Sequence, residues 1–205
     1  MDETKSRILS AGRGLLAERG LRAITTNALA ERARISKKTL YRHFASKEEL
    51  VGAVLIAFLE EKLARWDAIL DDEGAPAIER IARSLDYVAQ FLPQIQAQVL
   101  NQVERAPVTP ELWRQIDAIR LHRLVRLKGL MESAQAEGHL RSDIDPDHWI
   151  LLLLGAVQTV LVPWVLLEKG IPLPDIVRAV KTIYHDGLLT EKGRRYVRQR
   201  RKENA

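Results

Sequence analysis

Residues 35–50 read ISKKTLYRHFASKEEL, and this stretch decides the fold of the N-terminal part of the chain. Together with the residues before it, the stretch predicts two short helices, at about 26–33 and 37–44. The three residues 34–36 join them, with Ser36 placed to cap the second helix. Two short helices with a turn of this length are typical of a helix-turn-helix.

The second of these helices has one apolar side and one basic side. On a helical wheel Leu40 and Phe44 fall together and face the core, whereas Lys38 and Arg42 lie opposite them. An α-helix fits the major groove of DNA, where Lys or Arg can donate to guanine O6 and N7. Thr, Tyr, His and Lys side chains at its edges can donate to phosphates. The pattern therefore predicts binding to double-stranded DNA.

The flanking segments predict the rest of this domain. A helix over about 3–19 ends before Gly20, a natural left-handed stop. Ser46 and Glu49 form a capping box, in which the Ser46 hydroxyl accepts from the Glu49 amide while the Glu49 side chain reaches back. A further helix therefore begins at Ser46 and continues to about residue 70.

Residues of about 5–52 resemble the tetracycline-repressor (TetR) family of transcriptional regulators. The resemblance rests on Thr-Leu-Tyr-x-His-Phe-x-Ser-Lys-Glu at 39–48, on Leu-Ala-Glu-Arg-Gly at 16–20 and on the threonines at 25–26. It implies an all-α fold, with an N-terminal three-helix helix-turn-helix domain and a C-terminal helical domain for ligand binding and dimerisation. Beyond residue 52 the chain is similar to the family only in its helical layout.

The resemblance also implies which side chains contact DNA. They lie at helix starts and on the outward side of the 37–44 helix: Thr25, Thr26, Ser36, Lys37, Lys38, Thr39, Tyr41, Arg42, His43 and Lys47. Residues 37–39 are expected to enter the groove, and Tyr41 and His43 to hold phosphates. Lys47 is expected to hold another phosphate, assisted by the N-terminus of its helix.

Two positions depart from the family pattern. The family often has glycine where this chain has Lys38, and the lysine adds length and charge that favour the reading of guanine. The family usually has glycine where this chain has Arg34. If Arg34 is left-handed, the strain is about 1 kcal/mol.

The charge of the chain is divided along its length. The 205 residues carry a net charge of +5, which is the balance of +5 over residues 1–50, −5 over 51–190 and +5 over 191–205. Positive charge clustered at one end suggests a polyanionic partner. With 46% hydrophobic and 29% charged residues, the composition argues against disorder of the whole chain.

The remainder of the chain is predicted to be helical, because apolar residues recur at three- and four-residue spacing. Prolines mark the expected borders of helices at about 76–92, 94–105, 110–137, 146–169 and 173–187. The predicted domains are the DNA-binding domain over 1–50, the ligand-binding and dimerisation domain over 51–189, and a disordered basic tail over 190–205.

Residues 149–167 form the most apolar run, with no formal charge. Its length suits a membrane span, but Gln158, Thr159 and Pro163 interrupt it. A helix that is apolar on all sides is otherwise buried on several sides, which predicts a homodimer and no membrane contact. In the TetR family the last two helices build the dimer bundle, and the expected contributors are Leu152, Val160, Val177, Val180 and Tyr184.

The resemblance further implies that the body holds a small-molecule effector. Its binding would change the separation of the two DNA-binding heads and release a repressor from a palindromic operator. Residues that combine aromatic and polar groups are the candidates for this pocket: Tyr87, Phe91, Gln98, Trp113, Gln158 and Trp164.

Nothing in the sequence predicts an enzyme, a cofactor or a metal site. The acids of 143–147 (DIDPD) resemble a calcium loop, but His148 and Leu154 stand where that loop needs glycine and glutamate. They predict a helix cap instead, with Asp145 as the cap residue. There is no cysteine, and no GxSxG, Walker or GxGxxG motif.

The favoured interpretation is a dimeric, cytoplasmic transcriptional regulator that acts as a repressor. The acidic start at residues 1–4 is unlike a signal peptide. Three alternatives stay open: an activator or architectural protein with an unresponsive body, an enzyme built from residues far apart in sequence, and a regulator anchored in a membrane through 149–167.

Overall fold

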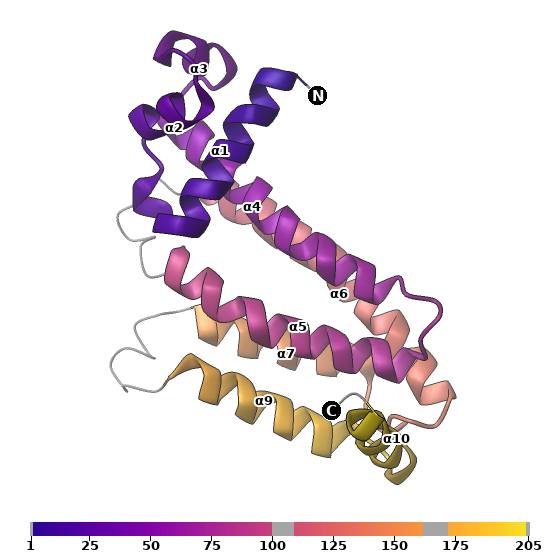
Figure 1. Ribbon diagram of the computed structural model, residues 1–205. Helices are drawn as coiled ribbons and strands as arrows, with labels where there is room; N and C mark the ends of the chain where they lie inside the picture. The colour runs from indigo at the N-terminus through magenta and orange to yellow at the C-terminus, as the bar shows by residue number, and fades with distance from the viewer. Residues whose placement is uncertain (1, 100–108, 162–171, 204–205) are drawn as a thin grey trace. The chain divides into compact units, whose positions relative to one another are not determined.

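The computed structural model describes residues 2–99, 109–161 and 172–203, and every regular element in these residues is a helix (Figure 1). The only strand-like feature among them is an isolated bridge between Leu140 and Leu189. The prediction of an all-α fold is confirmed.

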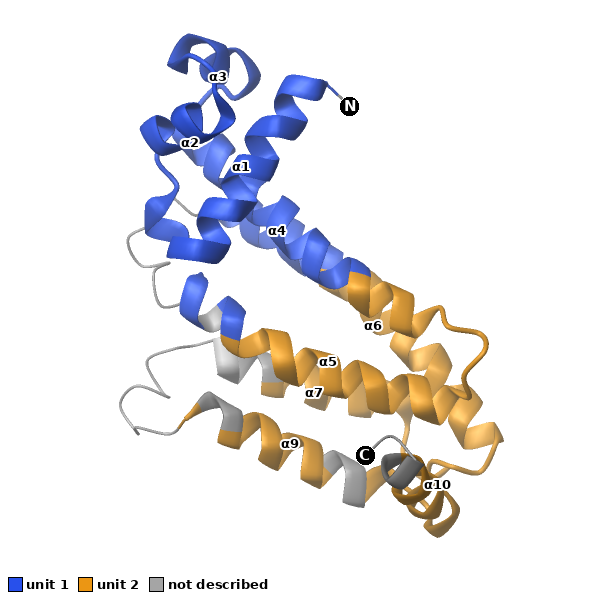
Figure 2. Cartoon of the chain, in the orientation of Figure 1, with its two compact units in different colours: residues 1–64, 94–119 blue, residues 65–93, 120–205 orange. Residues whose placement is uncertain are grey.

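The elements follow one another as α1 Glu3–Arg19, a 3₁₀ turn Leu21–Ala23, α2 Thr26–Ala33, α3 Lys37–His43, α4 Lys47–Leu70, α5 Ala77–Gln98, α6 Pro110–Ala136, α7 Pro146–Leu161, α9 Leu173–Leu188 and α10 Glu191–Glu203. The chain forms two compact units (Figure 2). Unit 1 holds residues 1–64 and 94–119, and unit 2 holds residues 65–93 and 120–205. Because α4, α5 and α6 are long, each contributes to both units, and the units do not follow the expected limit at residue 50.

Local sequence sets the helix starts in unit 1. The hydroxyls of Thr25 and Ser36 cap α2 and α3, each accepting from the amide three residues later. Ser46 Oγ accepts from Glu49 N at 3.1 Å, as the capping box predicts. The Glu49 carboxylate reaches back to Ala45 N at 2.6 Å, one residue before the cap.

The turn between α2 and α3 contains Arg34 in a left-handed conformation, with φ 53° and ψ 49°. Arg34 N donates to Glu31 O at 3.1 Å, and Ile35 N donates to Ala30 O at 2.9 Å. These two bonds are a Schellman motif, which satisfies the last carbonyls of α2. Arg34 is thus the left-handed residue for which a strain of about 1 kcal/mol is expected from the sequence, and the hydrogen bonds of the motif offset this strain.

The first helices pack around one small core. Leu40 and Phe44 are buried, as the helical wheel predicts. They join apolar side chains of α1, α2 and α4 that are likewise removed from solvent: Ile8, Leu16, Leu29, Leu50 and Val54. This core fixes the direction in which the opposite side of α3 points.

Gly12 lies on the side of α1 that meets α4. A Cβ atom at this position would come within 2.5 Å of Val54 Cγ2, so the helices approach more closely than alanine allows. We expect Gly12→Ala to lower the free energy of unfolding by about 1–2 kcal/mol in urea denaturation, because overpacking outweighs the gain in helix propensity. The control is Gly129→Ala in α6, where nothing lies within 4 Å. It is expected to raise stability by up to about 1 kcal/mol, and equal effects of the two substitutions would contradict the close approach.

The prediction of a disordered tail over 190–205 is wrong for Glu191–Glu203, which form α10. The helix is amphipathic: Val197 is buried and Tyr196 is half-buried, at helical spacing from Gly193. The hydroxyl of Thr190 accepts from Gly193 N at 3.1 Å and caps the helix start. Apolar contact on one side therefore orders a segment that its charge alone suggested was frayed.

The expected helix break at Pro93 is also wrong, since α5 continues through it to Gln98. Proline removes one hydrogen bond from the helix ladder. Leu92 and Ile95 on either side of it are buried, and their packing offsets that loss. Residues 100–105 of the helix expected there lie outside the described residues.

The acids before α7 behave as predicted. Asp145 Oδ1 accepts from Asp147 N at 2.8 Å and caps the helix. Within the part of the chain that the structure describes, no helix has the length and hydropathy that crossing a membrane requires. Residues 162–167 of the apolar run lie outside that part.

Candidate nucleic-acid interface and pocket

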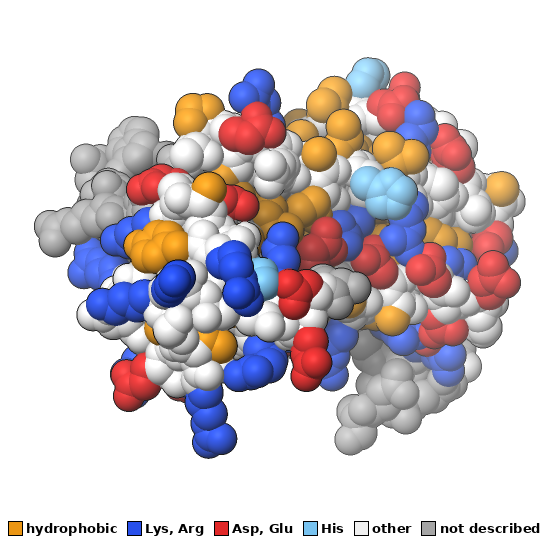
Figure 3. All heavy atoms as spheres, turned by 90° about the horizontal axis from the view of Figure 1, so that it is seen from above, with side chains coloured by type: hydrophobic (Ala, Val, Ile, Leu, Met, Phe, Trp, Pro, Cys, Tyr) orange, Lys and Arg blue, Asp and Glu red, His pale blue; other side chains and the backbone are white. Residues whose placement is uncertain are grey.

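The outward side of α3 is exposed and basic. Lys37, Lys38 and Arg42 are exposed, and Tyr41 keeps 48% of its surface in solvent. Lys47, the first residue of α4, is exposed as well. Lys and Arg side chains gather toward the left of Figure 3, over the N-terminal helices. Such a surface on a rigid core suits a polyanion.

Two of the hydroxyl groups predicted to contact DNA, those of Thr25 and Ser36, cap helices. Ser36 Oγ accepts from Thr39 N at 3.0 Å and lies 2.9 Å from Thr39 Oγ1. Thr25 Oγ1 accepts from Ala28 N at 3.2 Å, and Thr26 follows as the first residue of α2. These side chains therefore orient the helices, and their contact with DNA stays a prediction.

His43 differs from its expected place at the flank of the outward side. Its side chain is only 12% exposed, and its Nδ1 lies 3.2 Å from Asp2 Oδ2. The imidazole therefore joins the N-terminus of α1 to the end of α3. The structure therefore places His43 apart from the exposed cations of α3, and its contact with a phosphate stays a prediction.

An ion-pair cluster around the buried Arg123 joins α4 to α6 within unit 2. Arg123 is buried, and it donates to both oxygens of Asp67, through Nε at 3.1 Å and Nη2 at 2.8 Å. Arg126 donates to Asp67 as well and also pairs with Asp71. No local sequence pattern predicts this cluster, because the acidic partners of the two arginines lie more than fifty residues earlier in the chain.

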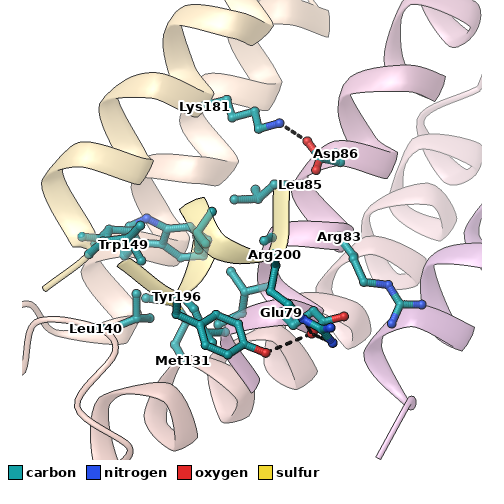
Figure 4. A pocket seen from close by; sticks show the side chains of 16 residues that line it. Glu79, Arg83, Leu85, Asp86, Met131, Leu140, Trp149, Lys181, Tyr196 and Arg200 are labelled. Atoms are coloured by element: carbon teal, nitrogen blue, oxygen red, sulfur yellow. Dashed lines mark hydrogen bonds and ion pairs between the residues drawn. The ribbon is translucent and has the colours of Figure 1, made fainter. Parts of the chain in front are cut away.

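Unit 2 encloses a cavity of about 360 Å³ (Figure 4). Its walls come from α5, α6, α7, α9 and α10, and most of the lining side chains are apolar, among them Ile81, Leu85, Met131, Trp149, Leu188 and Val197. A cavity of this size and lining is typical of sites for small organic molecules.

Most charged groups of the cavity are paired with one another, whereas Arg83 pairs with Asp72, which does not line it, at 2.6 Å. Glu79 of α5 accepts from Tyr196 Oη at 3.0 Å and from Arg200 at 3.0 Å (Nε) and 2.8 Å (Nη2), both on α10. Farther along α5, Asp86 pairs with Lys181 of α9. Hydrogen bonding to Arg200 lowers the pKa of the Glu79 carboxyl, although burial acts in the opposite sense. No three His, Asp or Glu side chains gather as a metal site in the described ranges.

The residues predicted to bind the ligand do not line this cavity, as far as the described residues show. Tyr87 and Phe91 pack ring against ring on α5, 5.1 Å between centroids. Gln98 donates to Ala17 O at 2.8 Å, and Trp113 is half-buried, both in unit 1. The side chain of Gln158 and all of Trp164 lie outside the described residues. The signal that could have found the cavity is the periodicity of α5, where lining positions recur at 78, 81, 82 and 85.

The predicted dimer residues have mixed environments. Leu152 of α7 is exposed, Val180 is half-buried, and Val177 packs with Ile176 against Leu92 of the same chain. The side chains of Val160 and Tyr184 lie outside the described residues. Further exposed apolar side chains that the sequence reasoning missed are, at 61–69% exposure, Leu121, Val125, Leu151 and Ile183.

Comparison with known proteins gives consistent similarities. Residues 8–54 match the family described as bacterial regulatory proteins, tetR family. The HTH-type transcriptional repressor KstR2 of Mycobacterium tuberculosis is 31% identical over 150 residues, which cover 72% of this chain and 74% of that protein.

Two solved structures share the fold. A transcriptional regulator from Saccharomonospora viridis in complex with choline has a TM-score of 0.70 at 17% identity, covering 93% of this chain and all of that one. The regulator FadR from Bacillus subtilis in complex with stearoyl-CoA has a TM-score of 0.60 at 19% identity, covering 87% and 96%.

Proposed function

Because the chain belongs to the tetR family of bacterial regulatory proteins, we propose that it is a homodimeric repressor released from a palindromic operator by a small molecule. Membership makes it a DNA-binding transcriptional regulator, and its relatives are transcriptional regulators rather than enzymes. The dimer, the operator symmetry and the effector are the proposed parts. DNA as the target also argues for action in the cytoplasm.

The observation that carries the proposal is the exposed basic side of α3. Lys37, Lys38 and Arg42 project from a helix whose opposite side, with Leu40, is locked in the core. A rigid helix of this kind can enter the major groove and present its cations to base edges. The capped turn before it fixes the angle at which it enters.

We expect Tyr41→Ala and Lys47→Ala to weaken binding to every duplex sequence alike. Both side chains are exposed at the edge of the α3 surface, where phosphates would lie. Removing the Lys47 cation is expected to reduce the slope of the logarithm of the association constant against the logarithm of salt concentration by about one for each half-site. Fluorescence anisotropy of labelled duplexes over a salt series measures both effects. A loss confined to one DNA sequence would contradict the phosphate role.

Support for a homodimer comes from the exposed apolar side chains of unit 2. Leu151 and Leu152 of α7 and Ile183 of α9 each keep more than 60% of their surface exposed. Apolar patches of this kind on a helical surface mark interaction sites. In a two-fold dimer the same patch meets its copy, and two α3 helices then reach two half-sites.

Support for an effector comes from the cavity. It lies in the same unit as the C-terminal part of α4, which the Asp67–Arg123 pair ties to α6. Since α4 begins directly after the helix-turn-helix, a ligand that favours one packing of unit 2 also favours one position of α4. Two proteins of similar fold are described in complex with choline and with stearoyl-CoA.

The test of this part is release from DNA. The full chain bound to a labelled operator is exposed to a library of metabolites and drugs, and anisotropy is followed. We expect at least one compound to lower the anisotropy in a saturable manner. A complex that no compound changes would favour the alternative of a regulator with an unresponsive body.

A further inference from the structure

Glu79 lies at the edge of the largely apolar cavity and is held there by donors of α10. Its carboxylate receives three hydrogen bonds at 2.8–3.0 Å, two from the Arg200 guanidinium and one from the Tyr196 hydroxyl. Only 17% of the Glu79 side chain is exposed. Arg83, one turn further along α5, also lines the cavity and acts on Glu79 through its charge. The Glu79 carboxylate thus accepts from one guanidinium group and one phenol of α10 (Figure 4), whereas the Arg83 guanidinium pairs with Asp72 at 2.6 Å.

The donors on α10 are held in place independently of Glu79. Thr190 Oγ1 donates to Gly138 O at 2.8 Å, and Lys192 Nζ donates to Glu137 O at 2.7 Å. A Cβ atom at Gly193 would lie 2.2 Å from His139 O, so the first turn of α10 sits directly against that backbone. The first turn of α10 is therefore fixed, and this preorganised helix presents Tyr196 and Arg200 to the cavity.

The chemistry of the cavity favours a ligand with two distinct parts. The apolar walls, including Trp149, Met131 and Leu85, suit a hydrophobic body. Burying a lone charge among these walls would be costly, and the Arg200 and Tyr196 donors that now hold Glu79 can offset this cost for an anion. A neutral acceptor in place of Glu79 would leave the Arg200 guanidinium without a negative partner, whereas an anionic ligand replaces one negative charge by another.

We propose that the cavity binds an apolar ligand carrying a single anionic group, which displaces Glu79 from Tyr196 and Arg200. The proposal rests on the proposed function, since it names the ligand class of the effector cavity. After the exchange the donors again hold one negative group, that of the ligand. The Glu79 carboxylate moves away from α10. The contact of α10 with α5 thereby becomes dependent on the ligand.

The test uses two fluorescent probes that differ only in the anionic group. 8-Anilinonaphthalene-1-sulfonate is the anion, and N-phenyl-1-naphthylamine is the same aromatic body without the sulfonate. Both are titrated into the full chain and into Glu79→Gln, Arg200→Gln and Arg195→Gln. Arg195 is the matched control, because it is exposed on α10 and does not line the cavity. Ala82→Phe, which fills the cavity, reports whether either probe binds there, and circular dichroism checks that each variant is folded.

We expect Glu79→Gln to tighten sulfonate binding about tenfold and Arg200→Gln to weaken it by a similar factor, as for charged hydrogen bonds. The neutral probe is expected to keep its affinity in both variants, and Arg195→Gln to change neither probe. If Glu79→Gln changes the affinity of both probes by the same factor, or of neither, the proposed anion site is wrong, although the cavity can still be the ligand site. If Ala82→Phe leaves both probes bound with unchanged affinity, the cavity is not the ligand site, and the effector part of the proposed function fails separately.

Discussion

Replacing Lys38 by alanine is expected to weaken operator binding by about 2–6 kcal/mol while leaving the stability of the head unchanged. Lys38 is exposed on α3, opposite the buried Leu40, at a position where the family often has glycine. A lysine that donates to guanine contributes about 1–3 kcal/mol of discrimination, and a dimer makes the contact twice. The substitution should also remove the preference for guanine at one position of each half-site.

The measurement compares operator and random duplexes of the same length by anisotropy. The ratio of the two dissociation constants is expected to collapse in Lys38→Ala. In Tyr41→Ala, by comparison, both constants rise and the ratio is kept. If Lys38→Ala loses affinity for operator and random DNA by the same factor, Lys38 is a phosphate contact and does not read bases.

Replacing Asp67 by alanine is expected to lower the free energy of unfolding by about 2–3 kcal/mol. Asp67 supplies both oxygens that accept from the buried Arg123, and a buried ion pair that loses one partner leaves a charge poorly solvated. The value lies below the usual range for breaking a buried pair, since Asp67 itself keeps about a quarter of its side chain exposed. Urea denaturation monitored by circular dichroism measures the change.

Asp71→Ala is the matched control for this experiment. Asp71 directly follows the last residue of α4, and its side chain, which pairs with Arg126, is 68% exposed. Exposed pairs contribute about 0–1 kcal/mol. Equal losses from the two substitutions would show that burial of Arg123 does not matter. A larger loss from Asp67→Ala also supports the view that this pair fastens α4 to the body.

The head could be predicted from sequence because its determinants are local. The caps at Ser36 and Ser46 bond amides three residues later. The left-handed Arg34 lies in the short turn that joins two neighbouring helices. Leu40 and Phe44 follow from helical periodicity over five residues. His43 differs because its partner, Asp2, is 41 residues away in the chain and no local pattern predicts the contact.

The site in the body depends on pairs that are distant in sequence. Glu79 meets Arg200 across 121 residues, and Asp67 meets Arg123 across 56. Side chains of this kind look like a solvated charged surface until the helices are packed. Aromatic residues such as Tyr87 and Phe91 were therefore chosen for the pocket on chemistry alone, whereas the cavity lies on another part of α5.

The tail shows a different reason for a failed prediction. The charge of residues 191–205 dominated its interpretation, although Tyr196 and Val197 stand at helical spacing from Gly193. Val197 is buried and Tyr196 is half-buried in the structure, and Thr190 caps the start of α10. These contacts hold the helix in place. A high density of charge predicts disorder only where no apolar residues recur at helical spacing in the same segment.

Selection of binding sites from a random duplex library by the full chain tests the central claim most directly. The enriched sequences are then used to measure how many chains bind one duplex. The proposed dimeric regulator predicts an inverted repeat whose half-sites are centred about one helical turn or a small multiple of it apart, occupied by chains in multiples of two. Enrichment of no common sequence, or of a single half-site bound by one chain, would contradict the account.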